Sequence, residues 1–183
     1  MVAAWPEPVE RVSSYLREAG AEARIEEFVD GTPTAQEAAA AVGCELGQIV
    51  KSLVFVCDDR YVIALVPGDR RGDRAKVAGA AGAKKVKVAS PAEVEHATGF
   101  APGGVAPFGV KRVETVLLDP TLLRHEVVWV GAGSPNHIVG LAPAELARVS
   151  RARAVDVVED HPYDFGGQRG GDFPGDPAQP KER

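Results

Sequence analysis

Five stretches of the chain combine helical spacing of apolar residues with helix end signals. In two of them a hydroxyl residue is followed three positions later by glutamate, as in a capping box: Thr34 with Glu37, and Ser90 with Glu93. Capping boxes mark the start of a helix, and Gly43 marks an end. The pattern predicts helices over these stretches: Glu7 to Ala19, Thr34 to Gly43, Asp73 to Ala81, Ser90 to Thr98 and Ala142 to Val149.

Short apolar or alternating runs predict strands between these helices. The turn Asp58-Asp59-Arg60 separates two apolar runs, which predicts a β-hairpin. Because strands and helices do not alternate regularly, we expect a mixed α/β fold with a central, mixed, curved and barrel-like sheet packed by several helices. The expected strands are Arg24 to Val29, Val50 to Cys57, Tyr61 to Val66, Lys84 to Ala89, Thr115 to Leu118, Glu126 to Val130, Ile138 to Leu141 and Ala154 to Val158.

The length of 183 residues and the 45% apolar content favour one folded domain, which we place at residues 1–158. Residues 159–183 are rich in glycine, proline and charge, and we expect a disordered tail. No apolar run approaches the roughly 18 residues that a membrane span needs, and the first residues do not resemble a signal peptide. Two isolated cysteines, Cys44 and Cys57, are typical of buried reduced thiols, so we expect a cytoplasmic protein.

The net charge of −5 is distributed unevenly along the chain. Residues 1–50 sum to −6, residues 51–155 to +5 and residues 156–183 to −4. Within the middle segment, Arg60 to Lys87 holds eight basic residues against two acidic ones. This segment is a candidate surface for a polyanion, and a solvated surface without a partner is the alternative.

A loop of small and turn-forming residues, Gly131 to His137, connects two apolar runs. Glycine allows a close approach to the backbone, and several N–H groups in such a loop can together face an anion or a developing oxyanion. An ordinary strand connection is the competing interpretation. The candidate residues of this loop are Gly133, Ser134, Pro135, Asn136 and His137.

Lys51 and the Gly-Pro-rich segment 99–109 are the other candidates for chemistry. Lys51 lies at the start of an apolar run, where a lysine is costly without a partner, and Ser52 adds a second polar group. A lysine at a strand end can also extend to the surface. The segment 99–109, which contains Gly103 and Gly104, is long for a simple connection and favours a binding role.

Several familiar sites are missing from the sequence. We find no phosphate loop, no G-x-S-x-G nucleophile elbow and no spacing of His, Cys or carboxylates that predicts a metal. We therefore expect no metal and no cofactor. A hydrolase here would act through positioning and backbone electrostatics rather than through a catalytic triad.

Three segments, in this order and spacing, resemble one family: Gly47 to Phe55, Thr98 to Gly109, and Ala132 to His137. The chain is similar to YbaK-like proteins, which are related to the editing domain inserted in bacterial prolyl-tRNA synthetases. The resemblance covers roughly residues 9–158. It implies the editing-domain fold and hydrolysis of the ester between a wrongly attached amino acid and the 3′ end of a tRNA.

The resemblance also assigns roles to the candidate residues. Lys51 would contact the terminal nucleotide and the ester region, Gly133 to His137 would shape the amino-acid pocket and position the water, and Gly103-Gly104 would line the same cleft. The segment Thr32-Pro33-Thr34 would lie near the pocket. The implied partners are the 3′ end and acceptor stem of an aminoacylated tRNA, with prolyl-tRNA synthetase as a further candidate.

One departure limits what the resemblance implies about the substrate. Some relatives have Asn or Thr after the lysine, where this chain has Ser52. We therefore expect a free-standing, trans-editing deacylase for a small amino acid on tRNA-Pro or a related tRNA, and leave the amino acid open. The alternative from another class is a non-catalytic module that binds an aminoacyl-tRNA or a nucleotide end.

Overall fold

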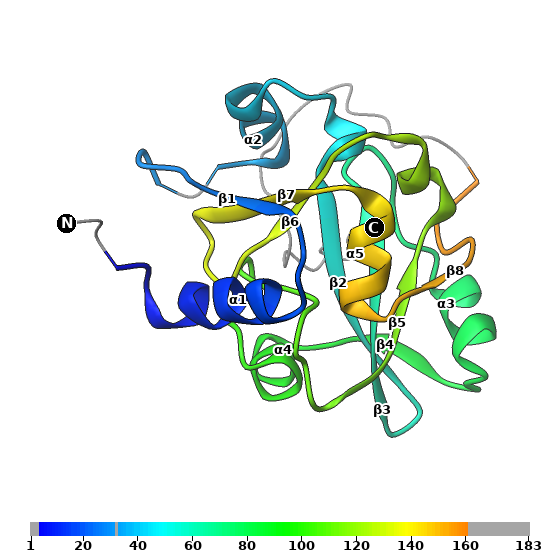
Figure 1. Cartoon of the computed structure of the whole chain (residues 1–183). Coiled ribbons are helices and arrows are strands. Elements are labelled where there is room, and N and C mark those ends of the chain that lie inside the picture. The colour runs from blue at the N-terminus through cyan, green and yellow to red at the C-terminus, as the bar shows by residue number, and fades with distance from the viewer. Residues whose placement is uncertain (1–3, 32, 161–183) are drawn as a thin grey trace.

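The computed structural model describes residues 4–31 and 33–160, which fold into helices packed on two β-sheets (Figure 1). The larger sheet has the strand order β4-β2-β3-β5-β8. The predicted hairpin β2–β3 is confirmed as an antiparallel pair, whereas β3–β5 and β5–β8 are parallel, so the sheet is mixed. Its strands are β2 (Val50–Cys57), β3 (Arg60–Pro67), β4 (Val86–Val88), β5 (Val113–Leu118) and β8 (Arg153–Ala154).

The smaller sheet is antiparallel and has the order β1-β7-β6. It consists of β1 (Ala23–Glu27), β7 (His137–Leu141) and β6 (Val128–Gly131). Among the described residues, one parallel bridge links it to the residue before β2, between Ile49 and Trp129.

The expectation of one central, barrel-like sheet is therefore wrong in its detail, because the described residues form two sheets and no closed barrel. The reason lies in how β2 is paired. Its whole length pairs with β3, and its end also pairs with β4, so only the start of β2 approaches β6. Apolar periodicity predicts strands but does not identify their partners.

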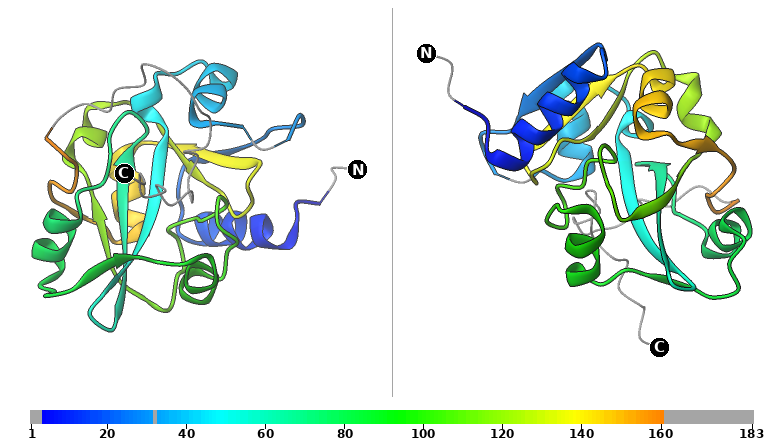
Figure 2. Two further views of the ribbon diagram at one scale, coloured as in Figure 1. Left: turned by 180° about the vertical axis from the view of Figure 1, so that it is seen from behind. Right: turned by 60° about the horizontal axis from the view of Figure 1, so that its bottom comes forward.

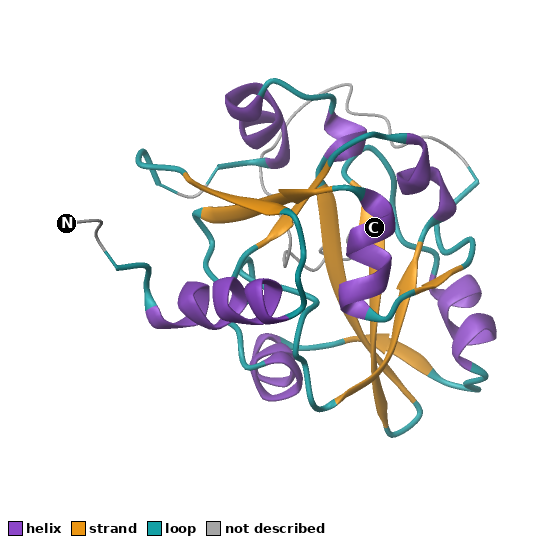
Figure 3. Cartoon of the chain, in the orientation of Figure 1, coloured by secondary structure: helices purple, strands orange, loops and turns teal. Residues whose placement is uncertain are grey.

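Five helices surround the sheets (Figure 3). Of the two predicted capping boxes, only Ser90 with Glu93 is reciprocal, since Thr34 accepts a bond from the Glu37 backbone N–H without one in return. The helices are α1 (Glu7–Glu18), α2 (Ala35–Val42), α3 (Arg74–Ala81), α4 (Pro91–Thr98) and α5 (Pro143–Ser150), and short 3₁₀ helices are η1 (Leu46–Gln48) and η2 (Pro120–Arg124).

The last predicted strand, 154–158, is shorter than expected, because β8 has only two residues. The segment that follows instead packs along residues 70–73. The Asp73 N–H donates to the Val157 carbonyl, Gly72 and Val158 form a bridge, and the Glu159 N–H donates to the Arg71 carbonyl. The rest of the predicted tail, residues 161–183, lies outside the described residues.

Three apolar clusters hold these layers together. The main core lies between the sheets and takes in α1, α4 and α5 (Figure 2). A second cluster joins α3 to the opposite face of the five-stranded sheet, and a third joins α2 to Ile49, Trp129 and Ile138. The two faces of each strand therefore meet different cores, which decides where each candidate side chain lies.

Candidate active site

The two glycine-containing segments that the sequence singled out meet in the structure. The Gly133 N–H donates to the Gly104 carbonyl over 3.0 Å. A Cβ atom on Gly104 would lie 2.7 Å from Ser134 Cα, and one on Gly131 would lie 2.4 Å from the Val105 carbonyl oxygen. Side chains at these positions would push the segments apart, so the glycines allow the two backbones to lie against each other.

Gly133 is required by its conformation as well as by its neighbours. Its φ is +105°, and a Cβ there would lie 2.6 Å from the carbonyl oxygen of Pro8, which sits in the first turn of α1. Helix α1, rather than a ligand, therefore occupies the space that the missing side chain of Gly133 leaves. This contact fixes the loop against the start of α1.

Hydrogen bonds within the loop use most of its backbone N–H groups. Those of Ala132 and Gly133 donate to the carbonyls of His137 and Gly104, and those of Asn136 and His137 donate to Ser134 Oγ and the Ser134 carbonyl. Within the described part of the chain, the Ser134 N–H makes no hydrogen bond. It is thus the loop's candidate donor to an anionic substrate atom.

His137 begins β7 and is 1% exposed. Its Nδ1 contacts Ser134 Oγ, and its ring meets the Trp5 ring edge-on with 5.3 Å between centroids. Burial lowers the pKa of His137, and the nearby Glu27 carboxylate opposes this shift less strongly. The imidazole is therefore neutral near pH 7, which is the state that a hydrogen-bonding or basic role requires.

Lys51 is confirmed as a buried lysine, with 6% of the residue exposed. Its Nζ lies 3.4 Å from the Arg70 carbonyl oxygen. Lys51 shares a face of β2 with Leu53 and Phe55, which pack in the second cluster. A desolvated ammonium group at this position can bind an anion more strongly than one in water.

Lys51 and His137 do not touch. The bridge between Ile49 and Trp129 sets Lys51 beside Gly131, and Gly131 pairs with Ile138. Two strand spacings of about 4.8 Å put the Lys51 and His137 backbones on the order of 10 Å apart. The pleat of β7 directs the His137 side chain, like that of Val139, toward the main core. The pleat of β2 directs the Lys51 side chain away from that core, toward the second cluster.

Ser52 also faces away from Lys51, because it lies on the face of Val50 and Val54. The expectation that it supplies a second polar group beside Lys51 is thus wrong. Its Oγ is buried and has no hydrogen-bond partner among the described residues. A buried hydroxyl in this state is a candidate contact for a polar substrate atom.

Some of the other predicted site residues lie in the two glycine-containing segments, and others lie outside them. Gly103 and Pro135 are half-buried members of the two segments, and the Asn136 carbonyl accepts the Phe28 N–H over 2.8 Å. Thr34 is the N-terminal cap of α2, and its hydroxyl accepts the Glu37 N–H. Thr32 lies outside the described residues.

Three neighbours of the site were not expected from the sequence: Trp5 against His137, Glu27 opposite His137 in the β1–β7 pair, and Arg70 at Lys51. Nothing in the sequence pattern pairs Glu27 with His137, because their contact depends on how two strands far apart in the sequence align.

The described residues contain no group of three His, Cys, Asp or Glu side chains suited to a metal. None of their helices is both long and apolar enough for a membrane span.

Comparison with known proteins places the chain in a family. The family described as "Aminoacyl-tRNA editing domain" matches residues 29–149. A solved structure described as "a putative trans-editing enzyme for prolyl tRNA synthetase" superposes with a TM-score of 0.80 and 38% identity, over 85% of this chain and 99% of that one.

Two curated bacterial proteins are also similar. The chain is 33% identical over 151 residues to "Uncharacterized protein YwhH" of Bacillus subtilis, covering 81% of this chain and 96% of the relative. It is 30% identical over 125 residues to "Putative Cys-tRNA(Pro)/Cys-tRNA(Cys) deacylase EbsC" of Enterococcus faecalis, covering 68% and 76%. The fold and these matches agree, and the chain belongs to the aminoacyl-tRNA editing domain family.

Proposed function

We propose that this protein is a free-standing deacylase that hydrolyses the ester of a mischarged aminoacyl-tRNA in trans. The observation that carries the proposal is the buried Lys51, on the strand that lies beside β6 and the packed glycine segments. An ammonium group that is largely removed from water interacts more strongly with a nearby anion than an exposed one does. The family and the relatives' names support the reaction type.

The reaction can be assigned to this chain's residues as follows. Lys51 holds the terminal nucleotide through its phosphate, as a point charge. The Ser134 N–H, without a partner among the described residues, donates to the oxyanion that forms when water attacks the ester. His137 and its loop form the wall of the amino-acid pocket. The free hydroxyl of the terminal ribose positions the attacking water, so no side-chain base is needed.

The substrate in this proposal is a small amino acid on tRNA-Pro or a related tRNA. One methylene group changes affinity by only about 1–3 kcal/mol, so the pocket must discriminate by excluding larger side chains. The reaction is cytoplasmic in this proposal. The relatives' link to prolyl-tRNA synthetase makes that enzyme the first candidate partner to test.

A second candidate is a binding module without turnover, and one observation favours it. Lys51 and His137 face different sides of their strands, so a single small substrate does not contact both without adjustment. Such a module would recognise an aminoacyl-tRNA end and protect it from hydrolysis.

A panel of labelled aminoacyl-tRNAs, incubated with the wild type and with Lys51→Ala, tests the proposal. We expect hydrolysis of at least one mischarged species and its loss in Lys51→Ala. Lys111→Ala is the matched control, because Lys111 is exposed and lies outside the basic segment Arg60 to Lys87, and it should retain activity. Binding without turnover of any species would favour the module instead.

A further inference from the structure

The hydrogen bonds around His137 fix where the proton on its ring lies. Ser134 Oγ donates its one hydrogen to Asn136 Oδ1 over 2.9 Å. The amide of Asn136 is oriented by its Nδ2, which points to the Phe28 carbonyl at 3.5 Å. Because Asn136 uses this hydroxyl hydrogen, His137 Nδ1 is assigned as the donor to Ser134 Oγ. In the neutral ring, Nε2 is then a bare acceptor.

Among the described residues, this acceptor faces the carboxylate of Glu27. His137 Nε2 is buried, has no hydrogen-bond partner among the described residues and lies 3.7 Å from Glu27 Oε1. The two residues are direct partners in the β1–β7 ladder, so their side chains share one face. Two acceptors at this separation repel each other, and a donor with N···O and N···N distances of about 2.9 Å can bridge them.

The charge at this position favours a cationic donor. The neighbouring Arg24 pairs with Glu26 at 2.8 Å. Within residues 4–31 and 33–160, no Lys or Arg forms an ion pair with Glu27. Burial lowers the pKa of His137, so the ring does not neutralise the carboxylate near pH 7. The Glu27 side chain is 48% exposed, which leaves the carboxylate open to a ligand.

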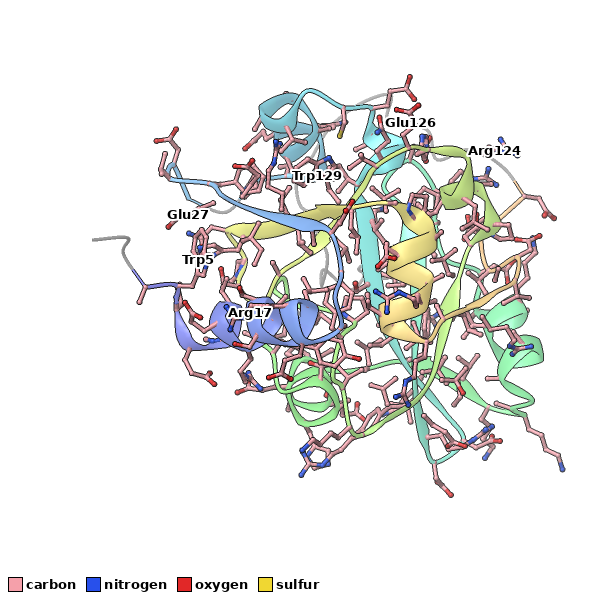
Figure 4. All side chains as sticks on the ribbon, in the orientation of Figure 1. Trp5, Arg17, Glu27, Arg124, Glu126 and Trp129 are labelled. Carbon is pink, nitrogen blue, oxygen red and sulfur yellow. The ribbon has the colours of Figure 1, made fainter. Side chains whose placement is uncertain are left out.

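Trp5 adds an aromatic surface to the same position. Its ring packs edge-on against His137 at 5.3 Å. Figure 4 shows Trp5 and Glu27 near each other at the same end of the molecule, beside the end of β1. A carboxylate, a bare imidazole nitrogen and an indole together suit a primary ammonium group, which donates hydrogen bonds and is attracted to aromatic rings.

We propose that Glu27 and His137 Nε2 bind a primary ammonium group and, on the basis of the proposed function, that this group is the free α-ammonium of the amino acid attached to the tRNA. The site then requires an unblocked amine. An aminoacyl-tRNA whose amine is acylated, such as a peptidyl-tRNA, lacks the charge and two of the three hydrogens, and escapes hydrolysis.

The test compares one mischarged tRNA with its N-acetylated form, using the wild type, Glu27→Gln and Glu26→Gln. A charge-assisted hydrogen bond supports a preference of about 10- to 100-fold in kcat/KM for the free amine in the wild type. In Glu27→Gln this preference should fall to within about threefold, through loss of activity on the free-amine substrate alone, since that variant retains the shape of the side chain but not its charge. Glu26→Gln is the matched control on the opposite face of β1 and should retain the preference.

Equal hydrolysis of both substrates by the wild type would overturn the inference and leave the deacylase intact. An unchanged preference in Glu27→Gln would overturn the role of Glu27. If the wild type hydrolyses neither substrate, the proposed function fails, and a binding measurement then tests the ammonium site separately.

The probe for this binding measurement is 3′-alanylamino-3′-deoxyadenosine, a stable amide. Binding of this probe that is at least tenfold tighter than that of its N-acetyl form, and is lost in Glu27→Gln, supports the ammonium site, and equal binding overturns it.

Discussion

Lys51 and His137 are both buried at the start of a strand, yet their surroundings are opposite in charge. Lys51 is a cation beside the Arg70 carbonyl, on the face of β2 that packs with α3. His137 is a neutral ring whose free acceptor faces the carboxylate of Glu27. The first surroundings suit an anion and the second suit a cation.

This difference matches the two charges at the end of an aminoacylated tRNA, which carries phosphates on the nucleotide and an ammonium group on the amino acid. A buried charge is stabilised by hydrogen bonds and by a partner of opposite sign. In the proposed function, Lys51 would therefore bind the phosphate and the Glu27–His137 pair the ammonium group, even though the two side chains do not touch.

Replacing Lys51 with methionine should produce the largest effect. Methionine has a similar length but no charge, so we expect deacylation to fall at least about 100-fold, as when a group that stabilises the transition state is removed. Stability should stay the same or rise, because an apolar residue replaces a buried ammonium group. Deacylation kinetics and urea unfolding measure the two effects. A large loss of stability would instead make Lys51 structural.

The glycine junction that connects the two regions provides the next test. In Gly133→Ala the new Cβ would clash with the Pro8 carbonyl at a φ of +105°, and we expect a loss of about 3 kcal/mol in the free energy of unfolding. Gly43→Ala is the control, since Gly43 also has a positive φ, +71°, but nothing lies within 4 Å. It should cost about 1–2 kcal/mol. Equal losses in urea unfolding would mean that the contact with α1 is unimportant.

We expect the basic residues near the five-stranded sheet to form part of the surface that binds tRNA. Lys84 and Lys85 are exposed beside β4, and both of their backbone N–H groups are held by Asp58. Reversing both charges should weaken tRNA binding about tenfold and reduce the slope of log K against log[salt] by roughly one to two. Filter binding across salt concentrations measures this slope. Unchanged affinity would remove the basic segment from the tRNA surface.

The smallest effect should be the contribution of His137 to the pH dependence of stability. Because burial lowers its pKa in the folded protein, the unfolded chain takes up a proton first as the pH falls below the ordinary value of 6.5. The free energy of unfolding should therefore fall as the pH is lowered through this range. His137→Asn should reduce this fall. An identical pH profile for both proteins, measured by urea unfolding, would show that His137 does not titrate differently on folding.

The sequence alone determined the positions of all five helices and of the β2–β3 hairpin. Each depends on contacts between residues close in the chain, such as the Ser90–Glu93 cap and the turn at Asp58. The sequence also identified the two glycine segments and a buried Lys51, because glycine and lysine are unusual in apolar surroundings.

Tertiary structure decided what those residues contact. The division into two sheets, the contact of Gly133 with Pro8 and the opposite facing of Lys51 and Ser52 follow from strand pairing and pleat. So does the pairing of Glu27 with His137, which lie 110 positions apart in the sequence. A sequence pattern reports which residues are apolar or constrained, whereas their partners depend on packing between distant segments, and that packing brings the charges of the candidate site together.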